Sequence, residues 1–129
     1  MFDPKKSDNG HTLPWEHLPA AAGNYVVGQV LNMTSGKLTA VSSALTTTPT
    51  YLCMAQKTCA AGDELPVTRI SKNYIYETTL SAEASTATVG TKMQVAAGGL
   101  QVNAAATGTF EVVSMEGTAA GDCVRGRWV

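Results

Sequence analysis

The chain has 129 residues, of which 44% are hydrophobic and 15% charged, and its net charge is −1. This length is typical of one domain, and the composition is unlike that of a disordered chain or a membrane protein. Nucleic-acid binding normally requires a basic patch, whereas the basic clusters here are limited to Lys5-Lys6 and the pair Arg125 and Arg127. The shortage of charge instead favours a surface that loses water at little cost against another protein.

The chain has three cysteines, Cys53, Cys59 and Cys123, an odd number at spacings that match no zinc motif. Three reduced thiols are the simplest interpretation, although Cys53 and Cys59 could pair across a turn. The N-terminal sequence lacks the apolar segment of a signal peptide, and no run approaches the roughly 18 apolar residues of a membrane span. We therefore expect a protein made in the cytoplasm that does not bind a membrane.

Residues 1–20 (MFDPKKSDNGHTLPWEHLPA) differ from the rest of the chain. Pro4, Pro14 and Pro19 lack backbone donors and favour extended geometry in the residues before them. This stretch is therefore not expected to form a stable helix or strand of its own, but its apolar side chains would still favour a surface. The sequence predicts an extended N-terminal arm that binds to a surface. The residues expected to contact that surface are Phe2, Pro4, Leu13, Trp15 and Leu18.

Residues 21–129 consist of short runs of strand-forming residues separated by turn signals, which is the pattern of a sandwich or small barrel. A helix is conceivable over residues 81–87 at most. The sequence predicts an all-β domain of eight or nine short antiparallel strands, formed by residues 24–33, 38–41, 49–55, 65–71, 73–80, 91–96, 100–103, 109–115 and 123–129.

A short turn sequence recurs along the chain. It is written Ala21-Ala22-Gly23-Asn24, Ala60-Ala61-Gly62-Asp63 and Ala119-Ala120-Gly121-Asp122, and each copy precedes a strand-forming run. Glycine reaches positive φ at little cost, and Asp or Asn can accept a hydrogen bond from nearby backbone to close a turn. The spacing is too irregular for a solenoid, so we interpret the motif as corner chemistry of a β fold.

The sequence offers no convincing catalytic group. Its two histidines, His11 and His17, lie in the predicted arm and match no metal motif, and there is no G-x-S-x-G nucleophile elbow. Asp63 and Asp122 follow glycine in the recurring corner and are expected to close turns. Neither G-x-G-x-x-G nor G-x-x-x-x-G-K-[ST] occurs. We expect a protein that is not an enzyme and holds no cofactor or metal.

Two segments are candidates for a subunit interface: one carries a pair of tyrosines, and the other carries two arginines and a tryptophan. Tyr74 and Tyr76 lie one pleat apart on one face of a predicted strand, where they could pack in the core, meet another subunit or stack on a sugar. Arg125 and Arg127 share a face of the last strand and are followed by Trp128. The arginines could pair with a neighbouring subunit or simply lie at a solvated strand edge.

Four short segments of the β region follow a family pattern: residues 28–31 (GQVL), 35–38 (SGKL), 49–52 (PTYL) and 62–67 (GDELPV). With the closing segments 108–113 and 121–129, the chain resembles the small head decoration proteins of tailed bacteriophages. The likeness covers most of residues 20–129 and depends on turn chemistry and strand texture. The residues of the arm do not match the family pattern one by one.

The resemblance implies a compact β-barrel or β-tulip domain over residues 21–129, commonly a homotrimer. Such a protein would be made in the host bacterial cytoplasm and would bind the outer capsid surface of the virion. The arm over residues 1–20 would clamp adjacent subunits of the major capsid protein and so stabilise the shell. Two alternatives are a carbohydrate- or receptor-binding module that uses Tyr74 and Tyr76, and a tail-tube or head–tail connector subunit.

Overall fold

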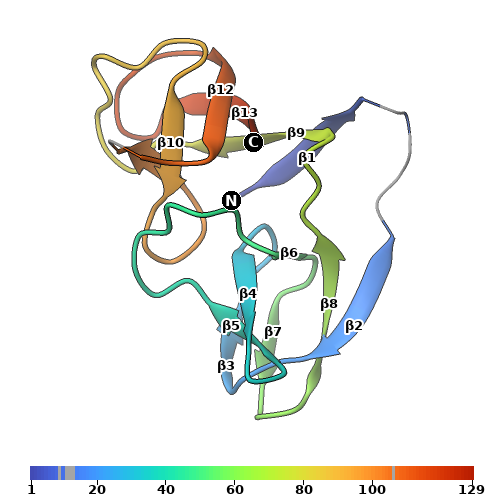
Figure 1. The fold of residues 1–129 in the computed structure, drawn as a ribbon. Coiled ribbons are helices and arrows are strands. Elements are labelled where there is room, and N and C mark those ends of the chain that lie inside the picture. Colours follow the sequence, from blue (N-terminus) through green and yellow to red (C-terminus); the bar gives the residue numbers. More distant parts are fainter. Residues whose placement is uncertain (9, 11–13, 106) are drawn as a thin grey trace.

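A computed structural model describes residues 1–8, 10, 14–105 and 107–129 (Figure 1). This part of the chain forms thirteen short strands and no helix. It therefore has no helix that could cross a membrane. The prediction of an all-β fold built from short antiparallel strands is confirmed, and residues 81–87 contain no helix.

The strands form three sheets. The six-stranded sheet has the order β1 (Asp3–Ser7), β9 (Tyr74–Thr79), β13 (Cys123–Trp128), β12 (Phe110–Met115), β10 (Lys92–Val95) and β11 (Val102–Ala104). The five-stranded sheet has the order β2 (Trp15–Pro19), β8 (Glu64–Arg69), β6 (Tyr51–Cys53), β4 (Val30–Thr34) and β5 (Lys37–Ala40). The third sheet pairs β3 (Gly23–Tyr25) with β7 (Lys57–Cys59).

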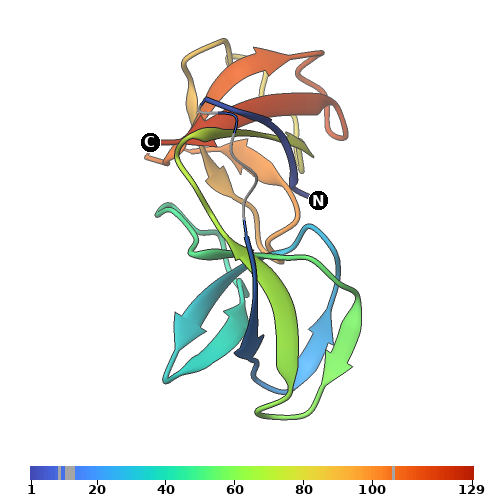
Figure 2. The same ribbon diagram turned by 90° about the vertical axis from the view of Figure 1, so that its right-hand side faces the viewer.

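The two larger sheets occupy different halves of the molecule (Figure 2). We call residues 15–70, from β2 to β8, the N-terminal unit, and residues 74–129, from β9 to β13, the C-terminal unit. In each unit the two end strands meet at one parallel bridge, Ala20 with Leu38 and Leu80 with Val102. Instead of the single barrel that the resemblance implied, the chain thus forms two curved units whose end strands meet at a bridge.

The two units share one topology. Replacing β2, β4, β5, β6 and β8 by β9, β10, β11, β12 and β13 turns the strand order of the first unit into that of the second. Their backbone hydrogen bonds also correspond: Gly62 donates to Ala20 at 2.9 Å, and Gly121, which lies 59 residues further on, donates to Leu80 at 2.8 Å. The chain is therefore an internal structural duplication.

The recurring corner marks equivalent places in the two units. The Oδ2 of Asp63 accepts a hydrogen bond from the Ala60 N–H at 2.9 Å, and the Oδ2 of Asp122 accepts one from the Ala119 N–H at 3.0 Å. The intervening glycines have φ of 92° and 87°, in the left-handed region that favours glycine. These two corners precede β8 and β13, the last strand of each unit, whereas residues 21–24 lead into β3 instead.

Two hydrophobic cores hold the units together. The larger core lies inside the C-terminal unit and also includes Phe2 and three residues of the N-terminal unit, Val30, Val41 and Leu52. The smaller core lies inside the N-terminal unit and contains Leu31, the neighbour of Val30 on β4. Because successive side chains of a strand point to opposite faces, β4 contributes to both cores and so joins the two units.

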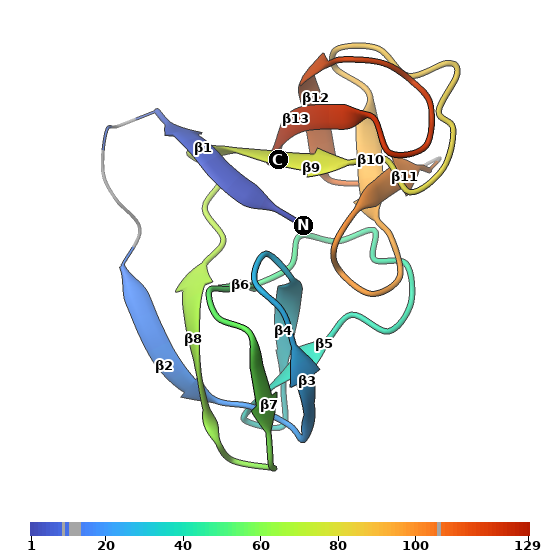
Figure 3. The same cartoon turned by 180° about the vertical axis from the view of Figure 1, so that it is seen from behind.

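The N-terminal segment is a correction to the sequence-based prediction. Residues 3–7 and 15–19 are not irregular: β1 pairs antiparallel with β9, and β2 pairs antiparallel with β8 (Figure 3). Pro4 lies opposite Tyr76, whose backbone N–H and C=O point away from β1 and toward β13. A residue at position 4 would therefore not donate its N–H to β9, and proline, which lacks this N–H, loses no ladder hydrogen bond there. The prolines are therefore compatible with edge strands.

The N-terminal unit contains two further departures. The run over residues 24–33 is interrupted at Gly28, whose φ of 82° turns the chain between β3 and β4. The strand β7, over Lys57–Cys59, was not predicted. It has only three residues and pairs with β3, which is equally short.

Candidate protein-interaction surface

Two of the predicted arm contacts belong to the structure of the chain itself. Phe2 is 1% exposed, and its ring lies 5.2 Å from Trp128 and 5.8 Å from Phe110, measured between ring centroids. The Phe2 N–H donates to the Gly28 carbonyl at 2.8 Å, and Pro4 pairs with Tyr76 in the sheet. Phe2 is thus a core residue and cannot serve as an exposed anchor.

Among the described residues of the predicted arm, Trp15 has the most exposed aromatic side chain. It begins β2 and is 57% exposed, whereas Leu18 on the same strand is half-buried against the smaller core. Leu13 and His11 lie outside the described residues. Trp15 is thus exposed, and it lies on a strand of the folded domain.

Of the alternatives for Tyr74 and Tyr76, the structure agrees with core packing for Tyr76. Tyr76 is fully buried; its ring lies 4.9 Å from that of Trp128, and its hydroxyl accepts a hydrogen bond from the Ser71 N–H at 3.1 Å. Burial raises the pKa of Tyr76. Tyr74 is half-buried, with its ring 6.2 Å from that of Tyr76. Since Tyr76 and Trp128 form the core of the C-terminal unit, they do not present a stacking surface or a subunit interface.

Arg125 and Arg127 pair within the chain. The Nε of Arg125 lies 2.7 Å from Oε2 of Glu77 on β9, and Nη1 of Arg127 lies 3.2 Å from Oδ2 of Asp8. Their strand, β13, lies between β9 and β12 and is not an edge strand. The arginines thus fix the N-terminal segment and β9 to β13, which differs from both the inter-subunit and the solvated-edge interpretations.

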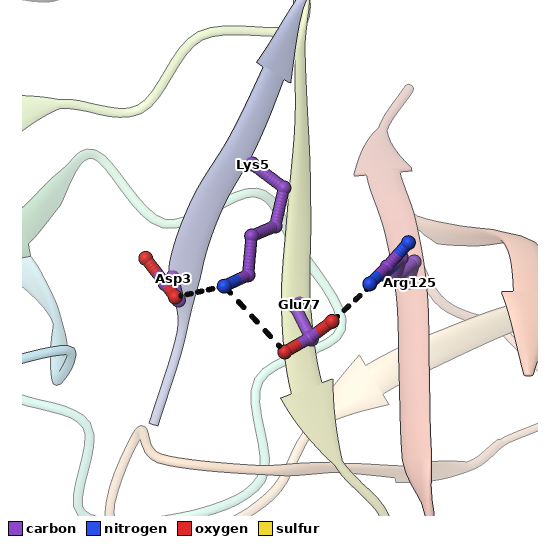
Figure 4. A network of polar contacts seen from close by, with 4 residues as sticks. All are labelled: Asp3, Lys5, Glu77 and Arg125. Carbon is purple, nitrogen blue, oxygen red and sulfur yellow. Dashed lines mark hydrogen bonds and ion pairs between the residues drawn. The ribbon is translucent and has the colours of Figure 1, made fainter. Parts of the chain in front are cut away.

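The pairing of Arg125 is part of a network across three strands (Figure 4). The Nζ of Lys5 on β1 lies 2.7 Å from Oδ2 of Asp3 and 3.8 Å from Oε1 of Glu77. The hydrogen bond from Arg125 is the largest cause that holds the pKa of Glu77 below its ordinary value. The hydrogen bond to Asp3 is the largest cause that raises the pKa of Lys5. Within this network, the contact of Lys5 with Glu77 links β1 to the C-terminal unit.

The outer edge of β2 is open at Trp15 and His17 in the described structure, whereas the chain just after Pro19 meets β5 at the bridge of Ala20 with Leu38. β2 is the end strand of the five-stranded sheet, and it begins at Trp15 (Figure 3). Ala20 accepts from Gly62 and donates to Asp63, both of which lie on the β8 side of the strand. Because backbone groups point to alternate sides along a strand, Trp15 and His17 direct their N–H and C=O groups away from β8.

A small apolar recess lies beside β1. It has a volume of about 170 Å³ and is lined mainly by Met1, Phe2, Pro4, Val27, Leu52 and Met54. Ligand pockets are typically ~300–1,000 Å³, so this recess is too small to enclose a typical organic ligand. Beside it, the Met1 amino group donates a hydrogen bond to the Leu100 carbonyl.

The His, Cys, Asp and Glu side chains of the described residues form no cluster typical of a metal site, since no three of them gather in a group that could hold a metal ion. The three cysteines are free thiols. Burial raises the pKa of Cys53, and burial together with the charge of Glu77 raises the pKa of Cys123, so both favour the unreactive thiol form.

Sequence reasoning missed the strand character of residues 3–7 and 15–19. The burial along β2 alternates, with Trp15, His17 and Pro19 exposed and Glu16 and Leu18 half-buried, but the apolar and polar residues of the sequence do not follow this alternation. The three prolines also argued against a strand. The open edge of β2 follows from the sheet order and so could not be read locally.

Comparisons with known proteins add no relative. The chain matches no protein-family model. No curated protein matches it either. The surface described here is therefore the main guide to function.

Proposed function

We propose that this chain is a structural, non-enzymatic subunit of a bacteriophage head that binds the outer surface of the capsid. The observation that carries the proposal is Trp15, a tryptophan 57% exposed at the start of an open edge strand. Tryptophan is enriched among the residues that dominate protein interfaces. The resemblance of residues 28–31, 35–38, 49–52 and 62–67 to head decoration proteins supports the capsid as the partner.

The proposed mode of capsid binding differs from the one expected from the sequence, in which a free N-terminal arm clamps adjacent capsid subunits. Residues 3–7 are held on β9 by backbone pairing and by the ion pair of Lys5 with Glu77, so they are not available as a free tether. We infer that the chain bridges adjacent major capsid protein subunits through surfaces of the folded domain. A homotrimer would present three copies of Trp15, and linked contacts gain by effective concentration.

Several features of the chain are compatible with this role. The surface is poor in charge and so desolvates at little cost. The two units share a core through Val30 and Leu52, which gives a rigid platform. The protein would be made in the host bacterial cytoplasm, where reduced thiols are the norm, and would reach the virion by binding preformed shells.

The proposal is tested by sedimentation of the purified protein with expanded shells of a phage that encodes this chain, stripped of their own copies. We expect Trp15→Ala to weaken binding about 30-fold, the equivalent of the ~2 kcal/mol of an interface hot spot. The matched control is Val89→Ala, since Val89 is an apolar residue 68% exposed on the C-terminal unit. Shells that bind neither wild type nor control would refute the function.

A second measurement tests the oligomer. We expect the mass in solution, measured by light scattering, to be three times that of the 13.4 kDa chain. A larger ring would favour a tail-tube or connector subunit instead. Glycan binding is not favoured, because Tyr76 of the tyrosine pair is fully buried.

A further inference from the structure

Because the two units share one topology, the edge of the C-terminal unit that is equivalent to the open edge of β2 indicates which kind of segment can pair there. β2 in the N-terminal unit corresponds to β9 in the C-terminal unit, because each pairs with the last strand of its unit in the same register. Leu18 pairs with Leu65 in the first unit, and Thr78 pairs with Val124 in the second. Trp15 is therefore the counterpart of Ile75, and His17 is the counterpart of Glu77.

The corresponding edge of β9 is occupied. There β1 adds to the sheet as an antiparallel strand, with Lys6 opposite Ile75 and Asp3 opposite Glu77 (Figures 1 and 3). Leu80 exchanges backbone hydrogen bonds with Gly121 and Asp122 on the β13 side. By strand alternation, Ile75 and Glu77 direct their backbone groups to β1. The same groups of Trp15 and His17 on β2 face no strand among the described residues.

We propose, on the basis of the function proposed above, that β2 is completed in the same way by the partner. An extended segment of the capsid subunit adds to the outer edge of β2 as an antiparallel strand, in the position that β1 occupies on β9. An exposed strand edge is a ready template for such pairing, and main-chain hydrogen bonds supply the affinity in this mode of recognition.

The chain limits the length of this strand. Pro19 lacks an N–H, so Trp15 and His17 provide the two outward donors of β2, and both residues also provide outward carbonyls. On β9 the four paired positions run from Glu77 back to Tyr74. The added segment is therefore a short strand of about five residues, which is a typical strand length.

The side chains around the edge define the chemistry of the occupant. β1 carries Lys5, which meets Glu77 beside Arg125. At β2 the counterparts of Glu77 and Arg125 are His17 and its cross-strand neighbour Pro66. Neither a carboxylate nor a guanidinium lies at these two positions, and the carboxylate of Glu16 on β2 is 3.9 Å from Nε of Arg69, so the edge does not select for an acidic-basic pattern such as that of β1. The segment is expected to be uncharged, with an apolar side chain beside Trp15.

The test distinguishes the contribution of the His17 backbone N–H to binding from that of the His17 side chain. His17→Pro removes the outward N–H but no bond to β8, and proline is tolerated on edge strands; His17→Ala is the matched control that keeps the N–H. Two probes are used: the stripped expanded shells, and a library of random eight-residue peptides displayed on their own messenger RNA. Thermal unfolding first establishes that both variants fold.

We expect His17→Pro to weaken binding of shells and of selected peptides at least tenfold, and His17→Ala to weaken it less than threefold. In the wild type, bound shells should slow hydrogen exchange of the Trp15 and His17 amides at least tenfold, a readout that needs no variant. Shells that bind without protecting these amides overturn the edge-strand inference and leave the proposed function standing. Selected peptides that protect them while shells do not bind refute the function and support the edge.

Discussion

The replacement of Phe2 by alanine distinguishes an integrated strand from a free arm. In an arm, this change would alter stability by less than about 0.5 kcal/mol, as surface substitutions usually do. In the structure, Phe2 is 1% exposed and contacts the rings of Phe110 and Trp128. Truncation of such a core residue removes buried area and leaves a cavity, which typically costs ~3–5 kcal/mol. We expect Phe2→Ala to destabilise the chain by this amount.

The measurement is urea unfolding followed by the near-ultraviolet circular dichroism of the packed aromatic rings. With an m-value of ~1–3 kcal/mol per molar urea, the expected loss shifts the midpoint down by about 2 M. Trp15→Ala is the control, because the side chain of Trp15 is mostly exposed. If Phe2→Ala does not fold, Phe2→Leu provides a smaller change of the same sign.

The result that would refute the reasoning is a Phe2→Ala midpoint equal to that of the wild type. It would mean that β1 does not contribute to the core and that residues 1–7 are free to reach a partner. The same experiment therefore decides between the two mechanisms of capsid binding.

Two further predictions concern the network and the corners. The pKa of Glu77 is lowered, chiefly by the hydrogen bond from Arg125, so its contribution to stability is present above the unfolded value near 4.5 and is lost as the pH falls through the folded pKa. The melting temperatures of wild type and Glu77→Gln should accordingly differ most at pH 7, and the difference should shrink as the pH falls below 4.5. Asp63→Ala and Asp122→Ala each remove one corner hydrogen bond, worth ~0.5–1.5 kcal/mol. Because the corners are equivalent, we expect equal losses in urea unfolding, and a large inequality would contradict the duplication.

The strands of the β region could be predicted because their signals are local. Alternating apolar residues and turn glycines mark segments such as residues 73–80 and 109–115, and the structure has strands at Tyr74–Thr79 and Phe110–Met115. The recurring Ala-Ala-Gly-Asp corner also predicted a repeated turn. It did not reveal the duplication, because equivalent strand positions hold different side chains: Arg69 on β8 corresponds to Trp128 on β13.

The N-terminal segment shows why a local pattern was insufficient. Prolines disfavour a strand where the ladder needs their N–H, and they are tolerated where the position points outward. Whether Pro4 points outward depends on its pairing with Tyr76, which lies 72 residues further along the chain. The burial of Phe2 depends on the same pairing. No window of neighbouring residues contains this information.

The open edge at Trp15 has the same origin. The sequence by itself determined the all-β class, the turn positions and the shortage of charge, because each follows from the residues of a short segment. Only the tertiary structure decided which strands are neighbours, and hence that β9 is covered by β1 while β2 is left open. Strand pairing joins backbone groups that are distant in the chain, and all residues but proline offer the same backbone groups, so the partner of an edge cannot be read from its own sequence.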